Sequence, residues 1–339
     1  MAADTLSDVL RSVRLRGALF YCLSYGDEWA AGAGPAKELA GSVIPGAEHV
    51  MEYHVLIKGS GWAAIVGEPP VRLEAGDIVM FPHGDAHVLS SAPGMRTQPL
   101  DPKWVDATRN DPKPIPIIFH TPTEFSYGTP APESPINLAC GFLGCDLRPF
   151  NPLITALPRL LHLPAGGDGA WISQVMQQAI AASQNKRPGG DAVLERISEM
   201  MFVDAVRRYV ERLPEASSGW LAGLRDRHVG RALALIHENP ARAWTVDGLA
   251  DDVALSRSAF YERFVRLVGQ PPMQYLTQWR MQAAANLLRQ SRAPVASIAL
   301  DVGYESEAAF TRAFKRLVGK PPASWRRDQN GQHEPGKTR

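Results

Sequence analysis

The stretch LSRSAFYERFVRLVGQPP at residues 255–272 recurs as ESEAAFTRAFKRLVGKPP at residues 305–322. Two phenylalanines, a leucine, a glycine and a Pro-Pro pair hold the same places in both copies. Ser256 and Ser306 are good helix N-caps, and a short apolar helix is predicted just before each of them. Each copy is therefore predicted to form a helix, a tight turn and a second helix, which is a helix-turn-helix.

The second helix of each copy is predicted to have two different faces. Its aromatic residues recur at i, i+4 spacing and are expected to face the core, as Phe260 and Phe264 and again as Phe310 and Phe314. A DNA major groove admits such a helix, and its polar or small side chains can reach base edges. The candidate DNA-contacting residues are those on the opposite faces, namely Arg257, Ser258, Tyr261 and Glu262 in the first copy and Glu307, Ala308, Thr311, Arg312 and Lys315 in the second.

A long helical segment, MQYLTQWRMQAAANLLRQS at residues 273–291, separates the two copies. Its roughly 20 residues span about 30 Å. Successive major grooves on one side of a duplex are roughly 34 Å apart. We therefore expect one chain to read two consecutive grooves. A solenoid is the alternative for repeated helical pairs, but it needs at least about three repeats.

Residues 226–327 resemble the DNA-binding domain of the AraC/XylS family of bacterial transcription regulators. Both recognition helices, the helix between them and the closing GQPP and GKPP stretches are in register with that family. The resemblance implies base or phosphate contacts from the nine residues above, among which Arg312 is the strongest candidate. It also implies a double-stranded DNA operator as partner, and RNA polymerase if the protein activates transcription.

Charge is distributed unevenly over the 339 residues, a length that suits two domains. Lysine plus arginine is 36 and aspartate plus glutamate is 35, for a net charge of +1. Residues 1–218 carry a net charge of −6 and residues 219–339 a net charge of +7. The basic second half favours nucleic acid as its partner.

The sequence lacks the features of membrane and secreted proteins. It contains no apolar run of about 18 residues and no signal-peptide pattern at its start. Three cysteines are too few for a disulfide scaffold. We therefore expect a cytoplasmic protein with no membrane partner.

Short strands dominate the first half of the chain. Residues 1–17 are predicted to form an amphipathic helix, and residues 17–90 contain apolar, partly alternating runs broken by glycine or proline. Residues 93–135 are predicted to be a loop excursion, within which IPIIF at 115–119 has strand character, as does the segment at 136–147. This density of strands predicts a barrel or sandwich.

The segment GDIVMFPHGDAH, residues 76–87, looks like the second half of a cupin β-barrel motif. The first half is weaker, because EYHVLIKG at 52–59 holds one histidine rather than two. Residues 1–210 resemble the cupin-type sensor domain of some AraC-type regulators. The predicted fold is therefore α+β with two domains: an N-terminal cupin-like β-barrel with flanking helices, and a C-terminal all-α domain with two helix-turn-helix motifs.

We predict the domain boundaries from changes in composition and in the spacing of apolar residues along the chain. Residues 1–213 are predicted to be the sensor and dimerisation domain, with 151–213 helical, and 214–225 a linker. A DNA-binding domain at 226–327 and a polar tail at 328–339 complete the chain. A helical stripe between Val193 and Val210 either packs on the strands or forms a homodimer interface, and both can hold on different sides of the helix.

The sequence leaves three possibilities for what the barrel senses. The first is a small ligand, because barrel mouths form ligand cavities. The second is oxidation of Cys22 and Cys140, which could form a disulfide. Their placement resembles that of paired cysteines in regulators that respond to reactive chlorine species, and buried packing is the alternative role. The third is a divalent metal held by His54, His87 and Cys140. No cofactor is otherwise expected.

Two further classes of protein compete with a non-enzymatic regulator. One is a cupin-fold metalloenzyme that carries an interaction module. Incomplete metal ligands argue against it. The other is an architectural DNA binder without an effector, which the long N-terminal half argues against.

Overall fold

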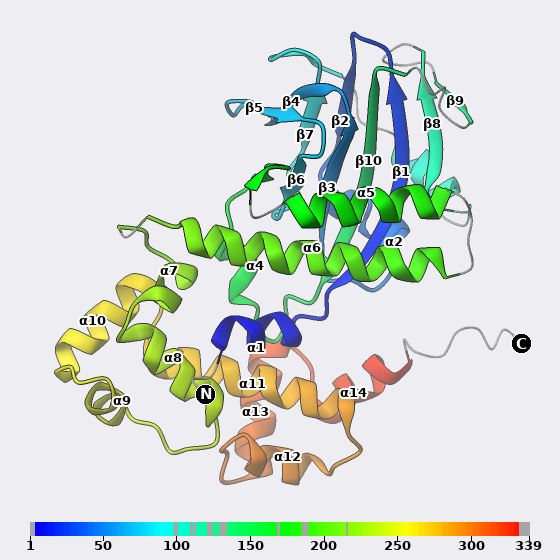
Figure 1. Cartoon of the computed structure of the whole chain (residues 1–339). Coiled ribbons are helices and arrows are strands. Elements are labelled where there is room, and N and C mark those ends of the chain that lie inside the picture. Colours follow the sequence, from blue (N-terminus) through cyan, green and yellow to red (C-terminus); the bar gives the residue numbers. More distant parts are fainter. Residues whose placement is uncertain are drawn as a thin grey trace, which may run out of the picture. The chain divides into compact units, whose positions relative to one another are not determined.

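The computed structural model of the chain describes residues 4–97, 101–108, 111, 113–120, 125–128, 134–167, 170–184, 189–214 and 216–331. The chain forms two compact units (Figure 1). We call them the barrel unit, Leu15–Asp146 with Leu157–Tyr209, and the helical unit, Met1–Arg14 with Leu147–Ala156 and Val210–Arg339.

Two β-sheets enclose the core of the barrel unit, as expected of a cupin-like barrel. The first sheet has seven strands in the order β11 (Leu161–Leu163), β6 (Ile78–Phe81), β3 (His49–Lys58), β10 (Ile136–Cys145), β1 (Arg16–Tyr25), β8 (Ile115–Phe119) and β9 (Phe125–Tyr127). The second sheet has four, in the order β2 (Ala30–Ala33), β7 (His87–Ser90), β4 (Ser60–Ile65) and β5 (Val71–Glu74). Side chains from both sheets form one apolar cluster between them.

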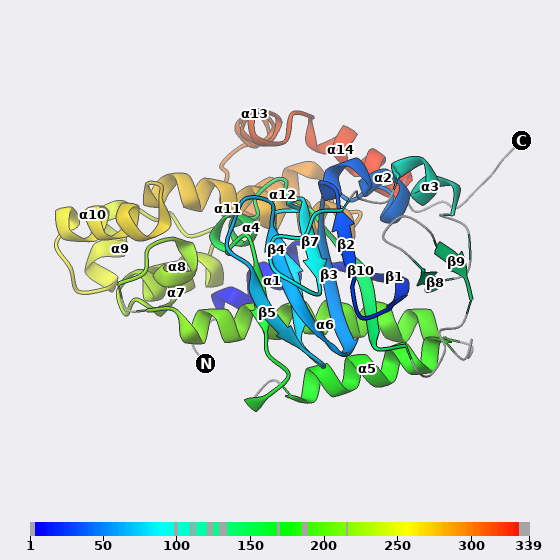
Figure 2. The ribbon, with the colours of Figure 1, turned by 90° about the horizontal axis from the view of Figure 1, so that it is seen from above.

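Strand β3 places side chains on both faces of the larger sheet, because successive side chains of a strand point to opposite faces. Val50 and Leu56 belong to the apolar cluster between the sheets, which places Glu52 and His54 on that inner face. Tyr53 points the other way, and its hydroxyl is 2.7 Å from Ser198 Oγ. Ser198 lies on α6 (Gly190–Arg212), which with α5 (Ala170–Gln184) covers the outer face of this sheet (Figures 1 and 2).

The helical unit contains both predicted helix-turn-helix motifs. The first is α9 (Val246–Asp252) with α10 (Arg257–Val268), and the second is α12 (Val295–Asp301) with α13 (Glu307–Val318). Helix α11 (Pro272–Gln290) runs between them with 19 residues. The remaining helices are α1 (Thr5–Ser12), α4 (Pro152–Ala156), α7 (Trp220–Arg225), α8 (Val229–Glu238) and α14 (Pro322–Gly331).

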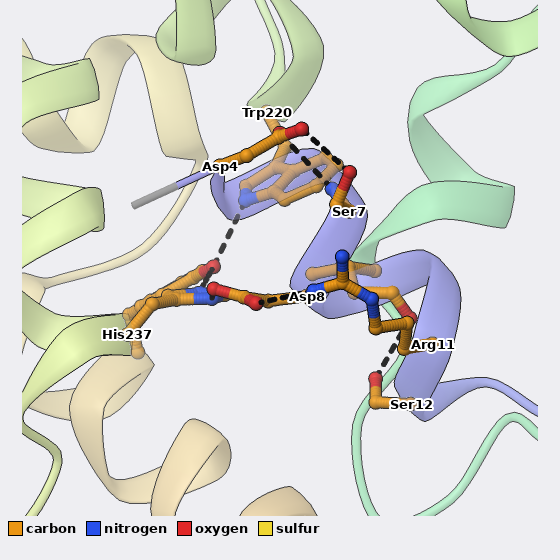
Figure 3. A network of polar contacts seen from close by, with 9 residues as sticks. Asp4, Ser7, Asp8, Arg11, Ser12, Trp220 and His237 are labelled. Carbon is orange, nitrogen blue, oxygen red and sulfur yellow. Dashed lines mark hydrogen bonds and ion pairs between the residues drawn. The ribbon is translucent and has the colours of Figure 1, made fainter. Parts of the chain in front are cut away.

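The amphipathic N-terminal helix, α1, packs within the helical unit rather than in the barrel (Figure 3). Its Val9 is fully buried, and Asp8 Oδ2 lies 3.7 Å from His237 Nδ1 on α8. The Gln282 amide on α11 donates a 2.9 Å hydrogen bond to the Ser12 carbonyl. The same side chain accepts one from the Phe150 backbone N–H at 3.0 Å. These contacts separate residues 1–14 and 147–156 from the predicted 1–213 domain.

Other segments also differ from the predictions. The expected loop at 93–135 contains α3 (Pro102–Ala107), β8 and β9, and the expected linker at 214–225 contains α7, whose Trp220 is buried. Within the predicted helical region 151–213, residues 161–163 form β11 because they pair with β6. Three further short helical segments or strands were not predicted, namely β2, η1 (Ala36–Glu38) and α2 (Ala40–Val43).

The ends of the chain agree only in part with the predictions. Helix α14 extends to Gly331, past the predicted start of the polar tail, and residues 332–339 lie outside the described chain. Among the described helices, none combines the length and the apolar character needed to cross a membrane.

Candidate functional site

The second helices of the two motifs, α10 and α13, begin and end in the same way. Ser256 and Ser306 are their N-caps, and each hydroxyl accepts a 3.3 Å hydrogen bond from the backbone N–H three residues later. Gly269 and Gly319 end the helices at φ values of 80° and 85°, which glycine adopts without strain. The sequence repeat is thus a structural repeat.

Each of these helices buries one face, as predicted. Phe260 and Phe264 of α10 are fully buried, as are Phe310 and Phe314 of α13. The second motif shares one apolar cluster with α11 and α14. Leu288 of α11 and Trp325 of α14 belong to this cluster. Anchoring one face in this way leaves the other face of each helix rigidly presented to solvent.

The structure places the nine predicted DNA-contacting residues on the outward sides of α10 and α13. Thr311 is half-buried, and the other eight are exposed: Arg257, Ser258, Tyr261, Glu262, Glu307, Ala308, Arg312 and Lys315. The two helices therefore present polar and small side chains in the pattern that groove recognition requires.

The two outward faces differ in available positive charge. Arg257 of α10 is held by Asp247 of the same motif, with Nη1 3.0 Å from Oδ2. Arg312 and Lys315 of α13 form no ion pair with described residues. Sequence reasoning missed two more exposed arginines, Arg266 and Arg316, although their i+4 spacing from Glu262 and Arg312 was visible.

A cavity of about 260 Å³ lies inside the barrel unit. Five aromatic residues line it: Tyr21, Tyr25, Phe119, Phe125 and Phe142. Its polar lining includes Glu52, His54 and Cys140 on the inner face of the larger sheet. The structure thus brings together three of the sequence-predicted barrel residues, His54, His87 and Cys140, and adds Glu52.

These side chains form a hydrogen-bonded chain whose direction is set at one end. His87 Nδ1 lies 2.7 Å from the Asp85 carbonyl, which can only accept, so His87 carries its proton on Nδ1. His54 Nε2 then donates to His87 Nε2 at 2.7 Å. His54 Nδ1 is left to accept from the Cys140 thiol, with Sγ 2.9 Å away. All three side chains satisfy one another in their neutral forms.

Burial favours those neutral forms. It holds the pKa of His54 well below its usual value and lowers the pKa of His87 to about 4. Burial also raises the pKa of the Cys140 thiol well above its usual value and that of Glu52 to about 8. Glu52 is 6% exposed, and its Oε2 has no hydrogen-bond partner among the described residues.

The set of residues that could hold a metal ion differs from the predicted set in one member. Ligand atoms of Glu52, His54 and His87 lie within 4.8 Å of one another, whereas Cys140 faces the opposite nitrogen of the His54 ring. Glu52 therefore replaces Cys140 in any metal-binding set. Two nitrogens on one tetrahedral ion with bonds of about 2.0–2.1 Å stand about 3.3 Å apart. The 2.7 Å between the two Nε2 atoms is shorter, so the pair as arranged is a hydrogen bond and does not fit an ion.

The sequence expectation that Cys22 and Cys140 could form a disulfide is not supported by the sheet. Cys140 pairs in register with Tyr21, and both face the barrel interior. Cys22 is the next residue of β1, so its side chain points to the other face. Two cysteines whose Cβ atoms point apart cannot be bridged without moving the backbone. All three cysteines are buried and in the thiol form.

Comparisons with known proteins place both units. Residues 4–211 match a cupin family, and residues 249–328 match a helix-turn-helix domain family. An AraC-like transcription regulator of Streptomyces lividans is 35% identical over 312 residues, which cover 90% of this chain and 92% of the relative. One from Streptomyces antibioticus is 33% identical over the same shares. The HTH-type transcriptional regulator AlkR of Acinetobacter baylyi is 27% identical over 313 residues, 90% of this chain and 93% of that protein.

Proposed function

The chain belongs to the AraC-like transcription regulators that join a cupin domain to a DNA-binding helix-turn-helix domain, and from this premise we propose that α10 and α13 read two consecutive major grooves of one operator. Membership in a family of regulators removes the alternative of a cupin metalloenzyme. The observation that carries the proposal is the repeated motif, whose second helices each anchor one face and expose the other.

The spacing of the two helices supports this reading. Helix α11, with 19 residues, is about 28 Å long at 1.5 Å per residue. That length is close to the roughly 34 Å between successive grooves on one side of a duplex. One chain can thus follow one face of the DNA over about one helical turn.

Roles differ between the two helices. On α13, Arg312 has no ion-pair partner among the described residues and can donate two of its guanidinium N–H groups to a guanine edge. Lys315 is placed one turn of helix from Thr311 and suits a phosphate. On α10, Tyr261 and Ser258 supply hydrogen bonds, Glu262 can accept from a cytosine amino group, and Arg257 must exchange Asp247 for DNA.

We further propose that the protein acts as a homodimer through α6. The predicted stripe is divided between two sides of this helix, with Leu194, Met201 and Ala205 buried in the unit. A different row, at positions 193, 196, 200, 203 and 207, alternates spacings of three and four residues, the pattern of a coiled-coil seam. Within it Val193, Met200 and Val203 are 52%, 40% and 37% exposed.

The barrel is proposed to sense a small effector in its cavity. The support is a cavity with five aromatic lining residues and a buried carboxyl oxygen that has no hydrogen-bond partner among the described residues. The cavity lies in the barrel unit and the recognition helices lie in the helical unit.

DNA recognition is tested by selecting fragments of genomic DNA with the purified full-length protein. We expect enrichment of sites at least 10³-fold over bulk DNA, which is typical of specific recognition. The affinity should fall steeply as salt rises, because phosphate contacts release counterions. Failure to enrich any site, or an affinity that ignores salt, would contradict the proposal.

A further inference from the structure

The described ionisable groups that line the barrel cavity can add negative charge but no positive charge, because Glu52 is neutral until a cation beside it favours the ionised carboxylate. Two carboxyl groups line the cavity, the buried Glu52 and the exposed Asp101. None of the described lining residues is a lysine or an arginine. The histidine that lines the cavity, His54, is neutral in the hydrogen-bonded chain with His87 and Cys140. A negatively charged ligand would find no cation among the described lining residues.

A buried carboxyl oxygen of the cavity has no hydrogen-bond partner among the described residues. His54, His87 and Cys140 satisfy one another, and His87 also donates to the Asp85 carbonyl. Glu52 Oε2 is buried and makes no hydrogen bond with any described residue. A buried polar atom without a partner costs free energy, so this oxygen is where a ligand gains most by donating a hydrogen bond.

The walls of the cavity suit a cation as well. Tyr25 and Phe119 stack with ring centroids 4.6 Å apart, and Phe125 stands 5.6 Å from Phe119. The face of an aromatic ring attracts a cation through its quadrupole, and more strongly where water is excluded. Aliphatic residues such as Leu23 and Leu89 complete the lining.

We propose that the barrel cavity binds a small organic amine in its ammonium form, which donates to Glu52 Oε2 while its apolar body packs against the aromatic wall. This inference deepens the proposed effector role of the cavity by naming the class of ligand. At about 260 Å³ the cavity lies just below the roughly 300–1,000 Å³ typical of drug-sized ligands. An amine with a single ring therefore suits it.

The competing occupant is a transition metal ion on Glu52, His54 and His87. It would have to break the 2.7 Å hydrogen bond between the two histidines and separate their nitrogens. An amine leaves that hydrogen bond intact and engages only the oxygen that lacks a partner. The arrangement of the side chains therefore favours the amine.

The test is isothermal titration of the full chain, without DNA, with three probes of nearly equal shape: benzylamine, benzyl alcohol and benzoate. We expect benzylamine to bind at least 10-fold more tightly than benzyl alcohol, and benzoate not to bind. Glu52→Gln should remove the preference for the amine and leave the alcohol unchanged. Glu74→Gln, an exposed glutamate of β5 that does not line the cavity, is the matched control and should keep it.

Several results would overturn the proposal. Equal binding of amine and alcohol, tighter binding of benzoate, or no binding of benzylamine would each do so, and these need only the natural sequence. Stoichiometric Zn²⁺ binding that His87→Ala abolishes would assign the site to a metal instead. Because no DNA is present, failure here leaves DNA recognition untouched. Conversely, amine binding that does not alter operator affinity would remove the effector role alone.

Discussion

Gln282 and Ser12 stand 270 residues apart in the sequence, yet the Gln282 side-chain amide donates a 2.9 Å hydrogen bond to the Ser12 carbonyl. Gln282 is 1% exposed on α11, the helix between the two helix-turn-helix motifs. Through its other atom it accepts from the Phe150 backbone. One side chain of α11 thus hydrogen-bonds to both the N-terminal helix and the 147–156 segment within the helical unit.

Replacing Gln282 by leucine should destabilise the protein by about 2–3 kcal/mol. The substitution leaves the Ser12 carbonyl and the Phe150 N–H short of partners in a mostly buried setting. Urea unfolding measures the change in the free energy of unfolding. Gln290→Leu, at the exposed end of the same helix, is the control and should change it by less than about 0.5 kcal/mol. Equal stability of both variants would mean that Gln282 does not join these segments.

Arg312→Ala should weaken binding to the selected operator by about 1–3 kcal/mol, as the loss of a base contact does. Its affinity for unrelated DNA should change little. Arg231→Ala removes an exposed arginine of α8, outside both recognition helices, and serves as the control in the same fluorescence-anisotropy titrations. An Arg312→Ala protein that retains full operator affinity would refute the role of this residue.

Glu52→Gln should stabilise the protein in a pH-dependent way. Burial raises the pKa of Glu52 from 4.5 to about 8, so between these values the unfolded chain is ionised at this residue and the folded chain is not. Folding then takes up a proton, and the stability of the natural protein falls as pH rises through this window. Glutamine has no such proton.

The free energy of unfolding of Glu52→Gln should therefore exceed that of the natural protein only slightly at pH 5. At pH 7 the difference should reach up to about 3 kcal/mol, at 1.36 kcal/mol per pKa unit. Unfolding of both proteins at pH 5, 6, 7 and 8 gives the difference, in which all other titrating groups cancel. Two parallel pH profiles would show that Glu52 is not held neutral in the folded state.

If the protein forms the proposed homodimer through α6, Met200→Glu should convert it into a monomer. Met200 lies at the centre of the exposed seam of α6, where a carboxylate would face its own copy or an apolar neighbour. Sedimentation equilibrium measures the association constant, which should fall at least 10-fold. Glu195→Lys changes an exposed residue on another side of the same helix and should leave the dimer intact. A natural protein that is monomeric at all concentrations would remove the proposal.

How far the sequence predicts the structure depends on the range of the interactions involved. The two helix-turn-helix motifs are specified by local signals. The N-caps Ser256 and Ser306 and the buried aromatic face were predicted and confirmed, and the structure adds that Gly269 and Gly319 end the second helices. The helix at residues 5–12 was also predicted from its amphipathic pattern. Its partner was not, because the contact with Gln282 spans the whole chain and has no local signal.

In the barrel, the sequence predicted His54, His87 and Cys140 as candidates and did not include Glu52, which the structure places beside them. Glu52 could have been predicted from the sequence, because side chains two residues apart on a strand share one face. Residues 52 and 54 therefore lie on the same face of β3. The same rule separates Cys22 from Cys140 once the register of β1 and β10 is known. Register depends on long-range pairing, so the sequence alone left the two cysteines as potential neighbours.

The reading of two consecutive grooves is tested most directly by hydroxyl-radical footprinting of the full-length protein on its selected operator. We predict that each bound chain protects two segments on one face of the duplex, with centres about 10 base pairs apart. Arg312→Ala should weaken one segment, and Tyr261→Ala the other. A single protected segment, or two variants that weaken the same one, would contradict the account.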